Sequence, residues 1–466
     1  MHAATPTDGG FTTIVERERG LKKTLSTAKL SMIAIGGAIG TGLFLGSGFA
    51  IGTAGPGVLI SYTIGALIGL LLMGCLAEMT IAHPTTGSFG AYAEYYIGPL
   101  AGFLVRYAYW TCVVLAVGTE VTAVAVYMKH WFPEVAGWIW IVVFSGALIV
   151  VNAFSVSAFG AVEYWLSLIK ITAIVAFIVL AACVISASSD STVGFRNYTA
   201  YGGFLPRGVG GVWIAVIIAV FSYFSIEMIA VAAGEAARPE VAIRSAFRST
   251  LVRLVLFYLL TLALMLAVIP WTQAGSTQSP FVLVMQASRL PAAGGAMNFV
   301  VLVAALSAMN SQLYITTRMM FSLSRAGHAP RSLGSLSRRG VPLNALLVST
   351  FGIALATVIT IISPAGAFLT MLGISAFGAM FTWMMIFVTH LFFRRVSAKV
   401  PGSFRMWGFP ATTLLGAALM AALLITTAFT DAFRTTLVFG LPFLAVLMLL
   451  YYFRYRPAVR DSPTTI

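Results

Sequence analysis

The chain has 466 residues, of which 59% are hydrophobic and only 9% are charged, and its formal net charge is +14. Soluble domains usually carry about a quarter charged residues, so this composition cannot cover a water-exposed surface. It excludes a soluble binding domain and predicts an all-α integral membrane protein embedded in a lipid bilayer.

A helix needs about 20 mainly apolar residues to cross the hydrocarbon core of a membrane. Twelve stretches meet that requirement, and we expect membrane-spanning helices at residues 29–51, 56–82, 99–128, 137–155, 161–186, 209–233, 245–269, 296–323, 341–362, 366–393, 409–430 and 433–455. Residues 1–28 form a polar segment without the pattern of a cleaved signal peptide, and residues 456–466 form a short tail.

Most of the 28 Lys and Arg residues fall in segments on one side of this topology, together with both termini. Such a bias marks the cytosolic side of a membrane protein. The positive charge therefore indicates orientation rather than a nucleic-acid partner. We expect a multi-pass protein of the cytoplasmic (inner) membrane with both termini in the cytosol.

The three cysteines all lie inside apolar stretches, and the five histidines are scattered along the chain. Neither set has the spacing of a disulfide framework or of a metal site. We expect no metal and no cofactor.

Two of the twelve spans contain residues that disfavour a continuous helix. Residues 36–42 in the first span include four glycines, which weaken an α-helix strongly. Residues 221–227 in the sixth span are rich in hydroxyl and aromatic side chains and end in Glu227. A charged residue at such a position is costly inside a membrane and is a functional hypothesis in itself.

The first and sixth spans are five apart, which is the offset between corresponding helices of two five-helix inverted repeats. Transporters built from such repeats place broken helices at matching positions near the middle of the membrane. The unwound backbone leaves amide donors and carbonyl acceptors that a ligand, an ion or buried protein must satisfy. The pattern therefore predicts a site for a small zwitterionic or ionic solute where the two spans cross.

At these residues the chain resembles the amino acid–polyamine–organocation superfamily, and within it the amino acid transporter branch of bacterial permeases. The similar stretches are residues 21–44, Gly87-Ser88-Phe89 with Tyr92-Ala93, residues 221–227, Ala233-Gly234-Glu235-Ala236 with Pro239, and residues 305–311. The resemblance extends over residues 21–455. It implies a leucine-transporter-type fold, with repeats at 29–186 and 209–393 within a ten-helix core at 29–393, and two additional helices at 409–455.

The chain departs from the family pattern at three positions. Ser225 stands where the break in the sixth span usually has a glycine, and Ala237 and Arg238 replace a lysine and an asparagine or aspartate. The extra side chain at Ser225 narrows the expected pocket or adds a hydroxyl to it, so the family's substrates do not carry over to this chain.

A free amino acid brings a carboxylate and an ammonium, and each must find a partner in place of water. Backbone amides that follow the first break begin a new half-helix, whose N-terminus favours an anion. Carbonyls that precede both breaks can accept the ammonium, and Phe221 can cover an occupied pocket. The candidate substrate-binding residues are Ile35, Ala38, Gly40, Thr41, Gly42, Glu120, Phe221, Ser222, Tyr223 and Ser225. The alternative is that the glycines and aromatic residues serve helix packing alone.

Lys170 lies deep in the fifth span, where its stem reaches the membrane surface only with difficulty. The family resemblance implies that its ammonium replaces the sodium ion of sodium-coupled relatives; the alternative is a fixed structural counter-charge. Glu227 is expected to couple protonation or gating to occupancy. Glu235 is expected to join an inner-gate ion-pair network, or else to be a solvated loop charge. Ser307, Asn310 and Ser311 share one helix face, from which they can hydrogen-bond Lys170 or a neighbouring helix.

These residues together predict a secondary active transporter that imports amino acids by proton symport with alternating access. Sodium symport and amino-acid exchange stay open as alternatives. A membrane-embedded enzyme is disfavoured because the sequence has no zinc-protease motif, no serine-hydrolase motif with a partnered histidine and no paired aspartates for a metal-phosphate centre. The absence of Walker motifs disfavours ATP-driven pumping by this chain alone. A channel is disfavoured because no filter-like repeat is present.

Overall fold

The computed structural model describes residues 8–17, 32, 37, 39–188, 193–232, 241, 243, 254–274, 278–288, 290, 292–396 and 404–455. Within these ranges the regular structure is helical throughout, with no strand. Ten helices in this part of the chain are long and apolar enough to cross a membrane. The expected all-α membrane class is confirmed. The expected count of twelve is not reached, because the first and seventh spans fall partly on residues outside the described ranges.

The long helices are α4 (Val58–Ala82), α6 (Pro99–Met128), α7 (Gly137–Phe154), α8 (Val156–Ala187), α9 (Gly208–Tyr223), α15 (Ala293–Arg325), α16 with α17 (Leu343–Ser349, Phe351–Ile362), α18 (Ala367–Val396), α19 (Ala411–Thr426) and α20 (Arg434–Leu450). Shorter helical elements complete the bundle: α1 (Asp8–Arg17), η1 (Gly42–Gly46), α3 (Ser47–Ala54), α5 (Ser88–Tyr96), α10 (Met228–Ala232), η5 (Leu254–Leu260), α12 (Thr261–Val268), α13 (Trp271–Ala274) and α14 (Pro280–Ala287).

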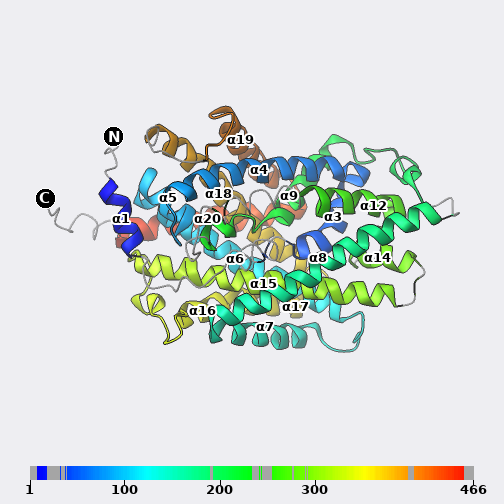
Figure 1. Ribbon diagram of the computed structural model, residues 1–466, viewed down its shortest axis with the longest axis horizontal. Helices are drawn as coiled ribbons and strands as arrows, with labels where there is room; N and C mark the ends of the chain where they lie inside the picture. Colours follow the sequence, from blue (N-terminus) through cyan, green and yellow to red (C-terminus); the bar gives the residue numbers. More distant parts are fainter. Residues whose placement is uncertain are drawn as a thin grey trace.

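The long helices run roughly parallel to the long axis of the molecule, and α1 and η9 (Tyr451–Tyr455), the first and last described elements, lie at the same end (Figure 1). The helices divide into an inner and an outer set. The most apolar stretch of α6 is 89% buried, and that of Gly208–Val231 is 94% buried, whereas the corresponding stretch is only 22% buried in α7, α8 and α20. The inner set, formed by α6, α9, α15 and α18 together with η1 and α3 of the first span, holds the candidate site.

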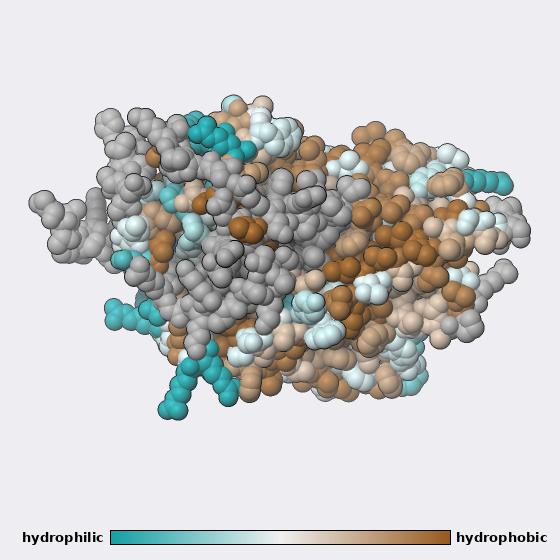
Figure 2. All heavy atoms as spheres, viewed as in Figure 1, coloured by the Kyte–Doolittle hydropathy of each residue, from teal (hydrophilic) through white to brown (hydrophobic). Residues whose placement is uncertain are grey.

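The outer helices expose large apolar side chains to their surroundings. Val150, Trp165, Phe439 and Phe453 are each more than half exposed. Hydrophobic residues form broad areas of the molecular surface in Figure 2. Soluble monomers rarely expose such large apolar areas, so this surface fits contact with lipid tails.

Candidate functional site

The sixth span is interrupted at the predicted position. Helix α9 ends at Tyr223, the chain turns, and α10 begins at Met228. Ser225 has φ +85°, in the left-handed region that glycine adopts most easily. The family's glycine at this position is therefore explained by the backbone conformation, which this chain maintains with a serine.

Glu227 stabilises this interruption from within. Its fully buried carboxylate accepts hydrogen bonds from the Ser225 amide (3.1 Å), from the Tyr109 hydroxyl (2.9 Å) and from the Trp383 indole N–H (3.1 Å). Tyr109 belongs to α6 and Trp383 to α18, so one carboxylate joins the broken span to two inner helices. The expected role of Glu227 in gating or protonation stays a prediction.

The first span crosses the sixth at its own break. Ile39 and Gly40 form a bend, and the helix resumes at Thr41 and continues into η1. The Ser222 hydroxyl donates to the Gly42 carbonyl (2.7 Å), and a β-carbon added to Gly42 would lie 2.7 Å from the Ser222 Cα. Glycine at position 42 thus permits backbone-to-backbone contact between the spans. Three candidate residues, Ile35, Ala38 and Glu235, lie outside the described residues.

Glu120, from α6, occupies the place that the sequence assigned to a substrate carboxylate. Its Oε2 atom accepts a hydrogen bond from the Thr41 amide (3.2 Å), and a β-carbon on Gly40 would lie 2.7 Å from its Oε1 atom. The side chain is only 3% exposed. The first amide of the new half-helix, where a helix N-terminus favours an anion, is therefore satisfied by the protein's own carboxylate.

Lys170, from α8, approaches the other side of the same break. Its ammonium donates to the Ile39 carbonyl (3.0 Å), and the side chain is fully buried. The two side chains therefore meet the break two residues apart, with the Lys170 ammonium at the Ile39 carbonyl and the Glu120 carboxyl group at the Thr41 amide.

Glu163 is a buried carboxylate that our sequence interpretation missed. It accepts hydrogen bonds from the Ser307 hydroxyl, from the Asn310 amide (2.9 Å) and from the Ser167 hydroxyl (3.1 Å), and it interacts electrostatically with Lys170. Two of the three α15 residues that we expected to bond Lys170 or a neighbouring helix, Ser307 and Asn310, thus bond a carboxylate on the neighbouring helix α8. The spacing of seven residues between Glu163 and Lys170, two helical turns on one face, was the available signal.

The remaining candidates lie near the crossing but differ in orientation. A β-carbon on Gly42 would lie 3.3 Å from the Phe221 ring, so this ring borders the crossing. Tyr223 instead donates to the Tyr62 carbonyl (3.1 Å) and packs against the Tyr258 ring. The Ser311 hydroxyl is buried without a hydrogen-bond partner among the described residues.

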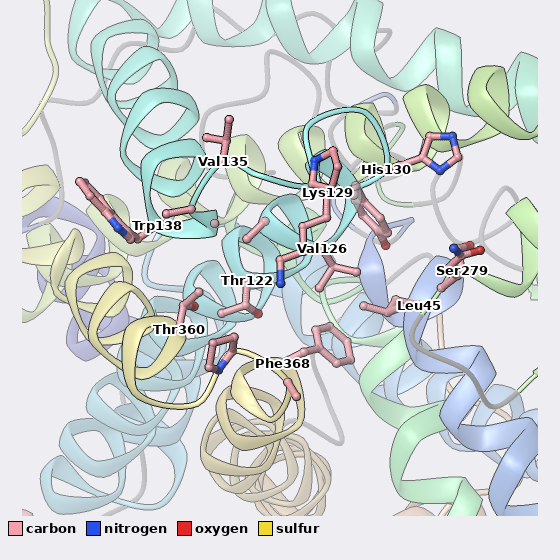
Figure 3. Close-up of a pocket in the computed structure, with 18 of the residues that line it drawn as sticks. Leu45, Thr122, Val126, Lys129, His130, Val135, Trp138, Ser279, Thr360 and Phe368 are labelled. Carbon is pink, nitrogen blue, oxygen red and sulfur yellow. The ribbon is translucent and has the colours of Figure 1, made fainter.

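A cavity of about 880 Å³ lies toward the end of the bundle away from α1. Its lining comes from η1 and α3, from the end of α6, from α14 and from the connection between α17 and α18 (Figure 3). Leu45 in this lining is four residues from Thr41, about 6 Å by helical rise, and Thr122 is two residues from Glu120. The cavity therefore ends about one helical turn from the break.

The end of the bundle at which α1 lies carries an ion-pair network that sequence reasoning also missed. Arg17 in α1 donates to both oxygens of Glu94 in α5 (3.0 and 2.8 Å), and the buried Arg106 of α6 pairs with the same carboxylate. Burial acts to raise the pKa of Glu94, but the Arg106 and Arg17 guanidinium groups lower it to about 2. Phe11 of α1 packs against the rings of His83 and Tyr95, so part of the N-terminal segment is a docked helix.

Comparison with known proteins gives a consistent result over nearly the whole chain. A family model described as amino acid permease matches residues 29–464. The gamma-aminobutyric acid permease of Bacillus subtilis (strain 168) is 38% identical over 427 residues, which are 91% of this chain and 91% of that protein. The aromatic amino acid transport protein AroP of Escherichia coli (strain K12) is 36% identical over 441 residues, which are 94% of this chain and 96% of that protein.

Proposed function

This chain belongs to the amino acid permease family, and on that premise we propose that it imports amino acids across the cytoplasmic membrane by proton symport with alternating access. As a permease it is a multi-pass transporter and not an enzyme. The proposal places both termini in the cytosol and assigns residues 29–186 and 209–393 to two inverted repeats. The interruptions in two spans that are five apart support this assignment.

One observation carries the proposed coupling: the Glu120 carboxylate bonds the Thr41 amide. A substrate carboxylate bound at the same half-helix would compete for that amide. Two carboxylates in one buried place repel strongly, because little solvent screens them. Substrate binding therefore requires that Glu120 is displaced or neutralised, and a proton neutralises it.

Proton uptake by Glu120 makes transport depend on protons without any separate proton channel. An amino acid binds when the carboxylate is protonated, and the proton leaves with the substrate on the other side. Substrate binding and protonation of Glu120 are then linked, because the substrate carboxylate and the Glu120 carboxylate compete for the Thr41 amide. Intramembrane carboxylates serve as proton carriers in many transporters.

Lys170 supports protons over sodium as the coupling ion. Its ammonium already bonds the Ile39 carbonyl beside the break, where it supplies a positive charge. A sodium ion in the same space would be repelled in an interior of low dielectric constant. Glu163, two turns earlier in α8, interacts electrostatically with Lys170, so the buried ammonium has a carboxylate partner without a further ion.

The two ends of the bundle support alternating access. A cavity approaches the break from one end, while α1, α5 and the Glu94 network cover the other. In the described conformation the cavity is on the side away from α1, which the proposal identifies as the outside. Opening the opposite side requires that the contacts between α1 and α5 separate.

The test is uptake of labelled amino acids into proteoliposomes with an imposed pH gradient or an imposed sodium gradient. The names of the relatives make γ-aminobutyrate and L-phenylalanine the first probes, followed by all twenty amino acids as competitors. We expect uptake that follows the pH gradient and ignores sodium. Glu120→Gln should lose the acceleration by pH while amino-acid exchange continues. Uptake driven by sodium and indifferent to pH would refute proton coupling.

A further inference from the structure

The cavity is separate from the break, although the two are close. Ile39 and Thr41 have no exposed surface, and Glu120 has almost none. A solute in the cavity therefore cannot reach the Thr41 amide until side chains at the cavity floor move. Its volume of about 880 Å³ lies within the range of small-molecule sites and exceeds the size of a free amino acid.

We propose that this cavity is a second amino-acid site, in which Lys129 holds the carboxylate of an incoming substrate before it reaches the break. The inference rests on the proposed transport function and deepens it. Figure 3 shows the Lys129 side chain extending into the cavity, with its ammonium directed toward Thr122. Glu134 contributes a carboxylate to the same lining. A cavity lined by both charges matches a zwitterion better than a simple anion.

Two buried hydroxyl groups point independently to a polar ligand. Thr360 and Tyr127 both line the cavity and are only 8% and 2% exposed. Neither side-chain oxygen has a hydrogen-bond partner among the described residues. Buried polar groups are nearly always hydrogen-bonded, so these hydroxyls require partners that a bound solute or ordered water provides.

The rest of the lining suits the apolar part of an amino acid. Leu45 of η1, Phe49 of α3, Val126 of α6 and Phe368 of α18 are apolar side chains of this lining. Ligand sites commonly combine such an apolar lining with a few polar groups that set the orientation of the ligand. A substrate would thus place its carboxylate near Lys129 and its side chain against Leu45 and Phe368, about one helical turn from the break.

The test compares uptake kinetics of four proteins in proteoliposomes: wild type, Lys129→Gln, Lys129→Arg and Arg196→Gln. Arg196 is the matched control because it is exposed in the η3 turn (Phe195–Tyr198), outside the cavity lining, and its substitution removes the same charge. We expect Lys129→Gln to raise KM about tenfold, the effect of one charge-assisted hydrogen bond, without changing the maximal rate. Lys129→Arg should be close to wild type, and Arg196→Gln should be unchanged.

Three results would overturn the proposal. The first is a KM for Lys129→Gln within about twofold of wild type. The second is an equal rise in KM for Arg196→Gln, which would mean general electrostatic attraction of the substrate. The third is competition by acetate that is as strong as competition by the unlabelled amino acid, which would make the cavity a simple anion site.

A second variant and a binding measurement keep the test independent of transport. Thr360→Val should also raise KM, and the KM of the double variant with Lys129→Gln should be no higher than that of Lys129→Gln alone, because both residues act on one carboxylate.

If wild type takes up no amino acid, the proposed function fails. Calorimetric titration of γ-aminobutyrate and L-phenylalanine into the protein in nanodiscs then decides the cavity site: binding lost in Lys129→Gln supports it, and no binding overturns it.

Discussion

Replacing Glu120 by glutamine separates the charge of this residue from its shape. The glutamine carbonyl can still accept the hydrogen bond from the Thr41 amide, which is 3.2 Å from the carboxylate in the native protein. Hydrogen bonds to charged groups contribute about 1.5–3 kcal/mol and neutral ones about 1 kcal/mol, so the bond weakens by about 1 kcal/mol. Two carboxylates about 4 Å apart repel by roughly 4 kcal/mol at an effective dielectric constant of about 20, and the variant removes this repulsion.

The change in hydrogen bonding alone corresponds to about fivefold in substrate affinity. We therefore expect Glu120→Gln to bind substrate at least about fivefold more tightly than wild type at alkaline pH. The wild-type affinity should fall as the pH rises, because ionised Glu120 then holds the amide that the substrate needs. The affinity of the variant should be independent of this titration, and a pH gradient should no longer accelerate its uptake.

The assay is equilibrium binding of the labelled substrate to purified protein from acidic to alkaline pH, followed by uptake with and without a pH gradient. Asp431→Asn is the control, since it makes the same chemical change at an exposed residue in the η8 turn (Asp431–Phe433). Weaker binding by Glu120→Gln at every pH would refute the reasoning. That result would mean that Glu120 contacts the ammonium of the substrate and does not compete with its carboxylate.

Three further predictions concern the surroundings of the site. Glu163→Gln leaves the Lys170 ammonium buried without its carboxylate partner, so the free energy of unfolding should fall by about 3–5 kcal/mol. Thermal unfolding in detergent measures this loss, which should be smaller in the double variant Glu163→Gln/Lys170→Met because that variant has no unpaired charge. Because the pKa of Glu94 is lowered to about 2, its ion pairs are complete above pH 4.5 and are lost only as the pH falls through about 2. Limited proteolysis at pH 4 should therefore find the N-terminal helix protected in wild type and cleaved in Glu94→Gln. Gly42→Val should abolish substrate binding and lower stability, whereas Gly146→Val, where a β-carbon meets nothing within 4 Å, should bind normally.

The positions of both breaks could be predicted because their causes are local. Four glycines in residues 36–42 and the hydroxyl-rich residues 221–227 weaken a helix whatever surrounds them. What stabilises the breaks is not local: Glu227 receives its hydrogen bonds from Tyr109 and Trp383, which lie 118 and 156 residues away. No spacing rule within one helix identifies partners on two others.

The charged residues show the same limit. Glu120 and Lys170 were predicted as functional because charge inside a membrane is costly, but their meeting at residues 39–41 depends on how α6 and α8 pack. Glu163 was missed although its spacing from Lys170 was visible. The Glu94 network was missed because charges near span ends usually face water, and only the docking of α1 reveals that this one is buried among guanidinium groups.

The geometry at the first break also explains why its ligand should be a zwitterion. At the break, the Ile39 carbonyl accepts a hydrogen bond from the Lys170 ammonium, and the Thr41 amide donates one to the Glu120 carboxyl group. An amino acid carries the same two groups on one small molecule, so it can replace both intramolecular contacts at once. A simple anion would take only the Thr41 amide, and a simple cation would meet only the Ile39 carbonyl, so either would make half of these contacts. The proposed site therefore favours zwitterions through the break, and it assigns the choice among amino acids to the side chains that line the crossing and the cavity.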